Sequence, residues 1–164
     1  MMSPKDAAWF CRNVEQLKQT MFRVAFSILR NTSDSEDAAS NAVLKAFQSF
    51  ERLNDKKAFR TWIIRILKNE CYALIRKRKP TLPLNEEYAG MYELSDSCID
   101  LNTAFERLSS DNRIAITLYY LEGYRIAEIA AILDVPIGTI KSRLSRARAD
   151  LKTILADTGL EVKI

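Results

Sequence analysis

Small and cationic side chains share one face of the last predicted helix, which follows Pro136. On a wheel of about 100° per residue, they fall opposite the apolar positions. Small residues permit close approach to DNA base edges, hydroxyl and guanidinium groups can hydrogen-bond to those edges, and flanking cations suit phosphates. The candidate DNA-reading residues are Gly138, Thr139, Lys141, Ser142, Arg143, Ser145 and Arg146. The alternative is a solvated surface helix, for which Lys and Arg are ordinary.

Two predicted helices and a tight turn position this face within residues 120–151. Apolar residues recur at three- and four-residue spacing in both helices. They are Ile126, Ile129, Ala130 and Leu133 in the first helix, and Ile140, Leu144, Ala147 and Leu151 in the second. Between them, Asp134 tolerates a left-handed backbone and Pro136 suits a first helical turn. The pattern predicts a helix-turn-helix whose second helix can lie in the DNA major groove.

A second candidate surface lies on a predicted helix that follows the loop at residues 54–57 and stops before Pro80. Its apolar face contains Phe59, Trp62, Ile63, Ile66, Leu67 and Leu74, and its polar stripe contains Arg65, Lys68, Asn69, Tyr72 and Arg76. Cations with an aromatic and an amide among them suit nucleic acid, including unpaired bases that need a stacking partner. The same composition also fits a solvated face, because the helix dipole stabilises cations at the C-terminal end of a helix.

Two further helices are predicted before this one. The first runs from about residue 7 to residue 30 on an apolar stripe. The second begins with a capping box formed by Ser33 and Glu36 and runs to about Leu53. Its predicted buried residues are Ala39, Val43, Ala46, Phe47 and Phe50. The acidic residues near its start are either there because they interact favourably with the helix dipole, or they form an acidic docking site.

Charge divides the chain into three parts. Residues 1–79 hold 16 Lys and Arg against 8 Asp and Glu, residues 80–100 hold none against 5, and residues 101–164 hold 9 against 8. The basic N-terminal part suits a polyanionic partner. We interpret residues 80–100, with two prolines and one glycine, as an acidic linker. The expected domains are therefore residues 1–79 and residues 101–164, with about four helices in the second.

The composition of the 164 residues favours an all-α protein, because glycine and proline are scarce and no alternating strand pattern stands out. The expected fold is two small helical domains joined by a flexible acidic linker, with the helix-turn-helix in the C-terminal domain. No apolar run is long enough to span a bilayer, and the first residues lack the apolar stretch of a secretory signal. We therefore expect a cytoplasmic protein without direct membrane insertion.

Side chains suited to catalysis are few. Histidine is absent, which removes the commonest general base and the usual activators of a nucleophile. Cys11, Cys71 and Cys98 are odd in number and widely spaced. They favour buried reduced thiols over a disulfide framework or a metal site, with redox sensing as the lesser alternative. The sequence thus predicts no enzyme, no metal and no cofactor.

Residues 122–151 follow the pattern E-G-x-x-x-x-E-I-A and then P-x-G-T-x-K-S-R-L-x-R-A-R. With this most specific segment, the chain resembles the bacterial RNA polymerase sigma factors of the small two-domain extracytoplasmic-function group. Residues 35–47 resemble the polymerase-docking helix of that family, and residues 59–79 resemble its promoter-melting helix. The chain departs from the family where Ser40 replaces a common glutamine, Ala73 an aspartate, Arg125 a small capping hydroxyl and Asp134 a turn glycine.

The resemblance implies a function for each part of the chain. Core RNA polymerase would dock on Asp37, Ser40, Asn41 and Leu44. The −10 element and its separated strand would be held by Asn54, Lys56, Lys57, Arg65, Lys68, Asn69, Tyr72 and Arg76. The helix after Pro136 would read the −35 element, and the linker would thread through core polymerase. The implied partners are core RNA polymerase, promoter DNA and an anti-sigma factor, without a small-molecule substrate.

Two alternatives to a sigma factor remain open at this point. The first is a helix-turn-helix regulator that binds its operator without polymerase. The second is a sigma-like adaptor or decoy that binds polymerase or an anti-sigma factor and does not direct initiation.

Overall fold

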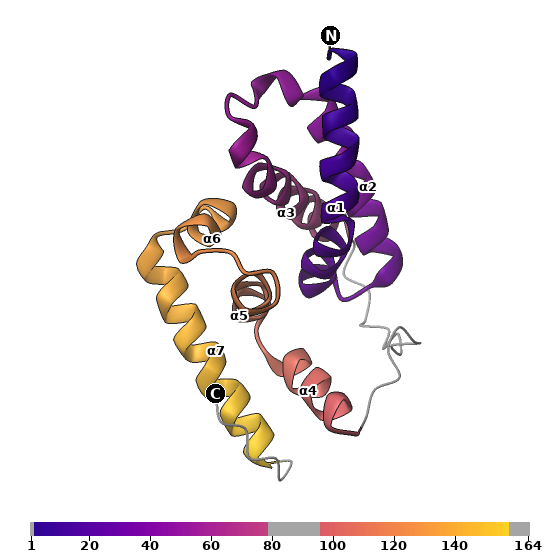
Figure 1. The fold of residues 1–164 in the computed structure, drawn as a ribbon. Helices are drawn as coiled ribbons and strands as arrows, with labels where there is room; N and C mark the ends of the chain where they lie inside the picture. The colour runs from indigo at the N-terminus through magenta and orange to yellow at the C-terminus, as the bar shows by residue number, and fades with distance from the viewer. Residues whose placement is uncertain (1, 79–95, 158–164) are drawn as a thin grey trace.

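α-Helices make up the chain in this computed structural model, which describes residues 2–78 and 96–157 (Figure 1). The described part contains no strand, so the all-α prediction is confirmed. The elements are α1 (Pro4–Leu29), α2 (Thr32–Gln48), η1 (Phe50–Arg52), η2 (Lys56–Ala58), α3 (Phe59–Lys77), α4 (Asp96–Arg107), α5 (Ser110–Ile116), η3 (Thr117–Leu121), α6 (Ile126–Leu133) and α7 (Ile137–Asp157). Helices α1, α2 and α3 form the N-terminal half, and α4 to α7 form the C-terminal half.

Helix α2 differs from its prediction at both ends. Asn31, and not Ser33, is its N-cap residue, because the Asn31 side chain accepts a hydrogen bond from the Asp34 backbone N–H at 2.8 Å. The helix ends at Gln48 and the one-turn 3₁₀ segment η1 follows, whereas the sequence predicted a helix to about Leu53. The predicted capping box is therefore wrong.

The buried face of α2 also differs from the prediction. Ala38, Ala42 and Ala46 are fully buried at four-residue spacing. Phe47, predicted to be buried, is 45% exposed. Its ring makes an edge-to-face contact with Phe10, with ring centroids 5.5 Å apart. The small alanine side chains let α2 approach α1 and α3 closely, and this close approach turns Phe47 outward.

Helix α3 ends at Lys77, two residues before the predicted end, and buries Ile63, Ile64, Leu67 and Cys71. Cys71 thus fits the prediction of a buried thiol, whereas Cys11 is exposed. Burial raises the pKa of Cys71 to about 12. Because the thiolate is the reactive form, the Cys71 thiol is protected from reaction in two ways: it is buried, and it stays protonated.

We expect an alkylating thiol probe at neutral pH to label Cys11 in the native protein and to label Cys71 only after denaturation. Peptide mapping by mass spectrometry before and after the addition of urea measures both rates. Equal labelling of the two residues in the native protein would contradict the burial of Cys71.

The C-terminal half begins earlier than predicted. Helix α4 starts at Asp96, inside the segment interpreted as a linker, and residues 80–95 lie outside the described residues. Ser109 caps α5, and its hydroxyl accepts from the Asn112 backbone N–H at 3.3 Å. The helix continues as the π-helical turn η3 until Gly123, whose φ of +68° ends it as predicted.

The helix-turn-helix forms as predicted from α6 and α7. Asp134 adopts the left-handed conformation, with φ 59° and ψ 46°, and terminates α6. Each of the four apolar positions expected to face the core from α7 is buried; they are Ile140, Leu144, Ala147 and Leu151. At the other end of α6, the Arg125 backbone N–H donates to Glu128 Oε2 at 2.8 Å. The Glu128 carboxylate therefore supplies a capping hydrogen bond at the start of α6, although Arg125 has no small hydroxyl.

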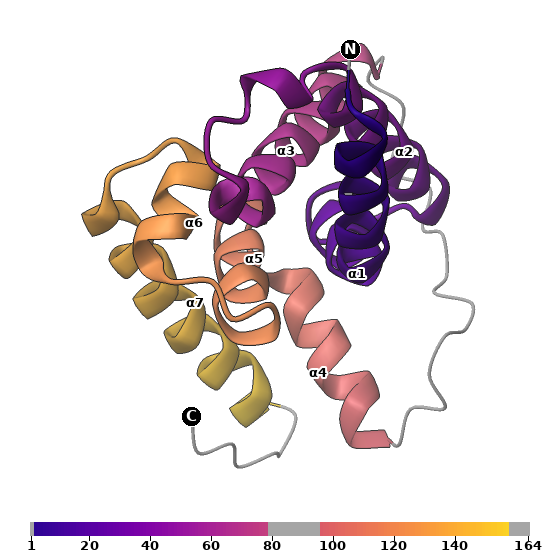
Figure 2. The ribbon, with the colours of Figure 1, turned by 45° about the horizontal axis from the view of Figure 1, so that its top comes forward.

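The two halves pack directly against each other. Helix α6 contacts α3, and α5 contacts α1, so that α5 and α6 lie between the N-terminal helices and α7 (Figures 1 and 2). The buried Arg113 of α5 donates through Nε to the Ser27 carbonyl oxygen of α1 at 2.6 Å. Helix α7 consequently keeps one long face free of the rest of the described chain.

Glu122 is the most deeply buried carboxylate between the halves, with a side chain only 3% exposed. One oxygen accepts from Thr20 Oγ1 at 2.7 Å, and both accept from the Arg23 guanidinium group. Burial alone would raise the pKa of Glu122, but the hydrogen bonds from Arg23 and Thr20 and the charges of Arg23 and Arg60 outweigh it. The pKa therefore lies below its ordinary value of 4.5.

A lowered pKa makes the Glu122 contribution to stability dependent on pH. The contribution is fully present above pH 4.5 and is lost as the pH falls through the lowered pKa. We expect Glu122→Gln to reduce the free energy of unfolding at neutral pH by roughly 1.5–3 kcal/mol, as for a lost hydrogen bond to a charged group. Urea denaturation of the wild type and of Glu122→Gln, from neutral pH to below pH 4.5, should give a difference in the free energy of unfolding that shrinks in acid. A difference that persists unchanged in acid would contradict the pKa assignment.

Candidate nucleic-acid interface

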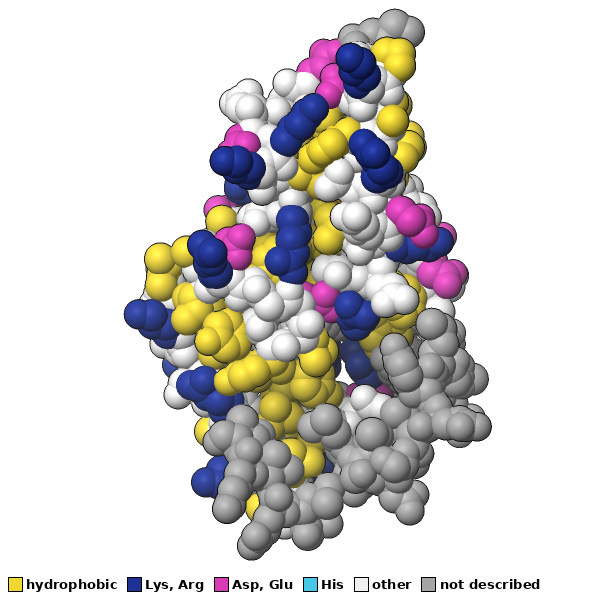
Figure 3. Space-filling view, viewed as in Figure 1, with side chains coloured by type: hydrophobic (Ala, Val, Ile, Leu, Met, Phe, Trp, Pro, Cys, Tyr) yellow, Lys and Arg dark blue, Asp and Glu magenta, His cyan; other side chains and the backbone are white. Residues whose placement is uncertain are grey.

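The outward face of α7 carries four side chains that are all exposed. Lys141, Ser142, Ser145 and Arg146 line a shallow open hollow on the helix. Gly138 has free space around it, since a Cβ atom there would meet nothing within 4 Å. Lys and Arg side chains line the edge of the molecule where α6 and α7 lie (Figure 3). This face offers hydroxyl donors and acceptors between two long cations, which matches the chemistry of a major groove and its phosphates.

Two of the predicted reading residues lie at the margin of this face. Thr139 is half-buried, and the Arg143 side chain is only 19% exposed. Arg143 Nη2 donates to Asp111 Oδ2 at 2.6 Å, which ties α7 to the start of α5. Arg143 is therefore held in a fixed position, while the side chains of Lys141 and Arg146 project freely.

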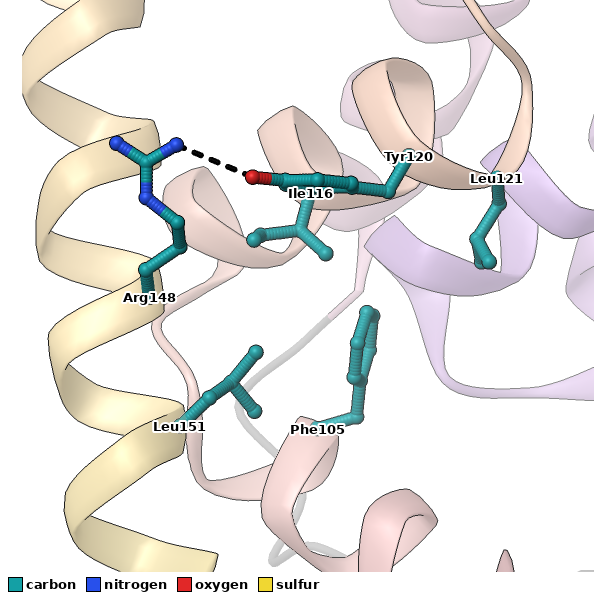
Figure 4. Close-up of a pocket in the computed structure, with 6 residues that line it drawn as sticks. All are labelled: Phe105, Ile116, Tyr120, Leu121, Arg148 and Leu151. Carbon is teal, nitrogen blue, oxygen red and sulfur yellow. Dashed lines mark hydrogen bonds between the residues drawn. The ribbon is translucent and has the colours of Figure 1, made fainter. Parts of the chain in front are cut away.

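An apolar hollow that the sequence reasoning missed lies on the side of α7 that faces α4 and α5 (Figure 4). It is lined by Phe105, Ile116, Tyr120, Leu121, Arg148 and Leu151. Arg148 Nη1 donates to the Tyr120 hydroxyl at 3.1 Å across its rim. Hydrophobic side chains gather on the surface in this region (Figure 3). Tyr120 and Leu121 are exposed and belong to the π-helical turn η3, which no periodicity in the sequence predicted.

The polar stripe of α3 is only partly exposed. Arg65, Asn69 and Arg76 are exposed, whereas Lys68 and Tyr72 are half-buried. Burial lowers the pKa of Lys68, with Asp134 acting in the opposite direction. Burial also raises the pKa of Tyr72, and the nearby charge of Asp111 raises it further. The charges of Asp134 and Asp111 show that the C-terminal half lies near this stripe: Asp134 opposes the shift of the Lys68 pKa, and Asp111 adds to that of Tyr72.

The loop before α3 carries the other residues predicted for the −10 element. Asn54, Lys56 and Lys57 are all exposed. Asp55 fixes the loop, because its side chain accepts from the Lys57 backbone N–H at 2.9 Å. Lys56 Nζ donates to Asp6 Oδ1 at 2.6 Å and lies 5.2 Å from the centre of the Trp9 ring. The loop cations thus lie directly before the start of α3, and Lys56 is held against α1.

A third surface lies on α2. Asp37, Ser40 and Asn41 are exposed, and Leu44 is 55% exposed. Phe47, one turn further along, adds a second exposed apolar side chain to this face. Neighbouring polar and apolar side chains of this kind are typical of a protein-binding surface. The predicted docking residues therefore share one helix face, and Phe47 extends it.

Other kinds of site find no support in the described ranges. Residues 2–78 and 96–157 contain no cluster of three or more potential metal ligands. In the same ranges, no helix is both long enough and apolar enough to cross a membrane.

Comparisons with known proteins identify the family to which each half of the chain is similar. Residues 14–81 match the family described as Sigma-70 region 2, and residues 99–151 match Sigma-70, region 4. The ECF RNA polymerase sigma factor SigM of Mycobacterium tuberculosis is 33% identical over 87% of this chain and 76% of its own length. The ECF sigma factor SigW of Bacillus subtilis is 29% identical over 93% of this chain and 91% of its own.

A solved structure extends the similarity to the whole fold. The sigma factor RpoE from Bartonella quintana, in complex with the anti-sigma factor NepR, superposes with a TM-score of 0.72 at 27% sequence identity. The superposition covers 90% of this chain and 96% of RpoE. The two family regions fall on α1–α3 and on α4–α7, the two halves that carry the basic stripe and the helix-turn-helix. The chain belongs to the extracytoplasmic-function family of RNA polymerase sigma factors, which direct promoter-specific initiation of transcription.

Proposed function

We propose that this sigma factor divides promoter recognition and polymerase docking among the three surfaces described above. The outward face of α7 reads the −35 element in the major groove. The α3 stripe and the loop before it hold the −10 element and its separated strand. The exposed face of α2 docks on core polymerase. In this proposal residues 1–79 and 101–164 act as the two domains, and α4 extends the second domain back to Asp96.

The observation that carries this proposal is the exposure of Lys141, Ser142, Ser145 and Arg146 over a fully buried apolar face of α7. A helix that is only structural needs no cluster of hydroxyls between two long cations. Base reading does need it, because hydroxyls and guanidinium groups hydrogen-bond to base edges while lysine contacts phosphates.

We assign no catalytic residue to this chain. Binding energy alone, spent on polymerase and on two DNA elements, would open the duplex. The site of action that follows from this role is the cytoplasm, where the polymerase and its template are found. Bound metal or cofactor chemistry has no part in the proposal.

An anti-sigma factor is the further partner that we propose. Support comes from RpoE, whose solved structure contains such a partner and whose arrangement of helices matches this chain over nearly its whole length. Co-purification of the tagged chain from its native host, followed by mass spectrometry, identifies the partner.

Reconstitution with core polymerase tests the proposed function. Purified core enzyme, this chain and genomic DNA should give transcripts whose start sites share two upstream motifs. The absence of promoter-specific transcripts, together with retained binding to core, would identify an adaptor or decoy instead. Tight and specific DNA binding without core enzyme would identify an ordinary helix-turn-helix regulator.

A further inference from the structure

An apolar side chain is exposed at the start of helix α7. Ile137, the first residue of this helix, is 48% exposed. Its neighbours Pro136 and Gly138 are exposed as well, and a Cβ atom at Gly138 would meet nothing within 4 Å. Single exposed apolar residues are ordinary on protein surfaces. The exposure of Ile137 is therefore informative only because of where this residue lies.

The turn before α7 does not depend on Ile137 for its packing. Val135 is half-buried and packs against the apolar core, and Ile140 is fully buried. Backbone hydrogen bonds start the helix, since the Pro136 carbonyl oxygen accepts from the Thr139 N–H at 3.0 Å. The residues on both sides thus fix the first turn of α7, and about half of the Ile137 side chain is left exposed to a partner.

Ile137 continues one edge of the outward face of α7. On a wheel of about 100° per residue, it lies about 40° from Lys141, which follows one turn later on the same helix. Side chains of an α-helix lean toward its N-terminus, so Ile137 lies ahead of Lys141 along the helix axis. In a helix-turn-helix, the N-terminal residues of the second helix contact the base edges. This position therefore brings Ile137 to the bases when Lys141 meets the phosphates beside them.

The major groove offers few partners to an exposed isoleucine. Most groups on the base edges there are hydrogen-bond donors or acceptors, and the exception is the 5-methyl group of thymine. Contact with a polar edge would remove water from a donor or acceptor without replacing its hydrogen bond. Contact with a methyl group is favourable, because it removes apolar surface of both partners from water. Among the four bases, thymine is thus the one that suits this side chain.

We propose that Ile137 is a specificity-determining residue of this sigma factor, and that it contacts the 5-methyl group of one thymine in the −35 element. The inference rests on the proposed reading of that element by the outward face of α7. In this arrangement Ser142, Ser145 and Arg146 hydrogen-bond to polar base edges, while Ile137 recognises a methyl group. At that position it distinguishes a T·A pair from a C·G pair, because cytosine lacks the methyl group and presents an amino donor instead.

Replacement of thymine by uracil tests the contact, because uracil pairs in the same way and lacks only the 5-methyl group. The template is a promoter mapped by reconstitution with core polymerase. Each thymine of its −35 element, on either strand, is replaced in turn by deoxyuridine in a synthetic duplex. Run-off transcription is measured with wild-type holoenzyme below saturation. One replacement should lower transcription about fourfold, the effect of one methyl group that is no longer buried.

Ile137→Ala should remove this sensitivity. The variant should transcribe the thymine promoter at least fourfold less well than the wild type, and uracil at the sensitive position should lower transcription no further, because both changes delete the same contact. Ile137→Val keeps a branched apolar side chain and should keep most of the sensitivity. Leu121→Ala is the matched control, since it removes a side chain that is 59% exposed from the same half of the chain outside α7. It should respond to uracil as the wild type does.

Two results would overturn the contact: a wild type that no uracil replacement affects, or an Ile137→Ala variant whose response to uracil is undiminished. Circular dichroism checks that the variant keeps its helices. Should Ile137→Ala lose helical content, Ile137→Ser decides the question, because serine is well tolerated at the start of a helix.

Base-pair substitutions across the −35 element separate this inference from the function on which it rests. If they lower transcription by the wild type while uracil does not, α7 still reads the element and the Ile137 contact alone is wrong. If they leave transcription by the wild type unchanged, the proposed reading of the −35 element fails, and the Ile137 contact fails with it.

Discussion

Replacing Arg146 with alanine will lower transcription from a promoter that needs its −35 element by about 5- to 150-fold. This range corresponds to the roughly 1–3 kcal/mol that one good side-chain pairing with a base contributes to discrimination. Arg146 is exposed on the outward face of α7 beside Ser142 and Ser145. Because the residue is exposed, its loss should change the stability of the domain little. Run-off transcription with reconstituted holoenzyme measures the effect.

Lys152→Ala is the matched control, because it removes one exposed cation from the same helix outside the reading face. It should change transcription little, and both variants should bind core polymerase as the wild type does. Equal loss of activity in both variants would mean that only the net charge of α7 matters. Full activity of Arg146→Ala on a −35-dependent promoter would show that α7 reads DNA through another face.

The helix-turn-helix could be predicted from the sequence because its determinants are local. Buried positions recur within one helix, as in Ile140 and Leu144, and the turn depends on a single residue that accepts a left-handed backbone. Asp134 meets that requirement with φ 59°, although glycine is more usual there. Where the apolar periodicity and the turn residue indicate the same structure, the sequence alone predicts the fold of the segment.

Details at the ends of α2 were less predictable because several residues compete for one role. Asn31 and Ser33 are both good caps. The choice depends on Arg30, whose left-handed φ of 54° ends α1 and makes Asn31 the first extended residue. Similarly, the spacing of apolar residues in α2 permits two adjacent stripes. The stripe of small alanines is buried because it allows closer helix packing, and Phe47 turns outward as a result.

Contacts between the halves left no signal in the sequence. Glu122 meets Thr20 and Arg23 across about a hundred residues, and Arg113 meets Ser27 across 86. Neither apolar periodicity nor a short sequence motif predicts such pairs, because they form only when both halves have folded. The same holds for Arg143, which helical spacing places beside the reading face but which the structure pairs with Asp111.

The second large effect is expected at the docking face of α2. Leu44→Ala combined with Asp37→Ala should weaken binding to core polymerase by at least tenfold, since truncation of a central interface residue commonly costs more than 1 kcal/mol. Leu44 exposes an apolar side chain to water, and Asp37 lies two turns away on the same helix. Burial of the leucine against a partner recovers the cost of that exposure, and the carboxylate orients the contact. Titration of labelled chain with core enzyme gives the dissociation constant.

Glu36→Ala separates a docking contact from a general effect of charge. Glu36 is exposed and next to Asp37, so its removal changes the charge of α2 by the same amount. If the affinity for core falls equally in Glu36→Ala and Asp37→Ala, the dipole of the helix, and not a contact, explains the acidic cluster. If the paired Leu44 and Asp37 substitutions alter promoter choice while the affinity for core stays unchanged, α2 contacts DNA and the docking face lies elsewhere. A selective loss of core affinity leaves docking as the role of this helix, because Leu44 is too exposed to stabilise the fold.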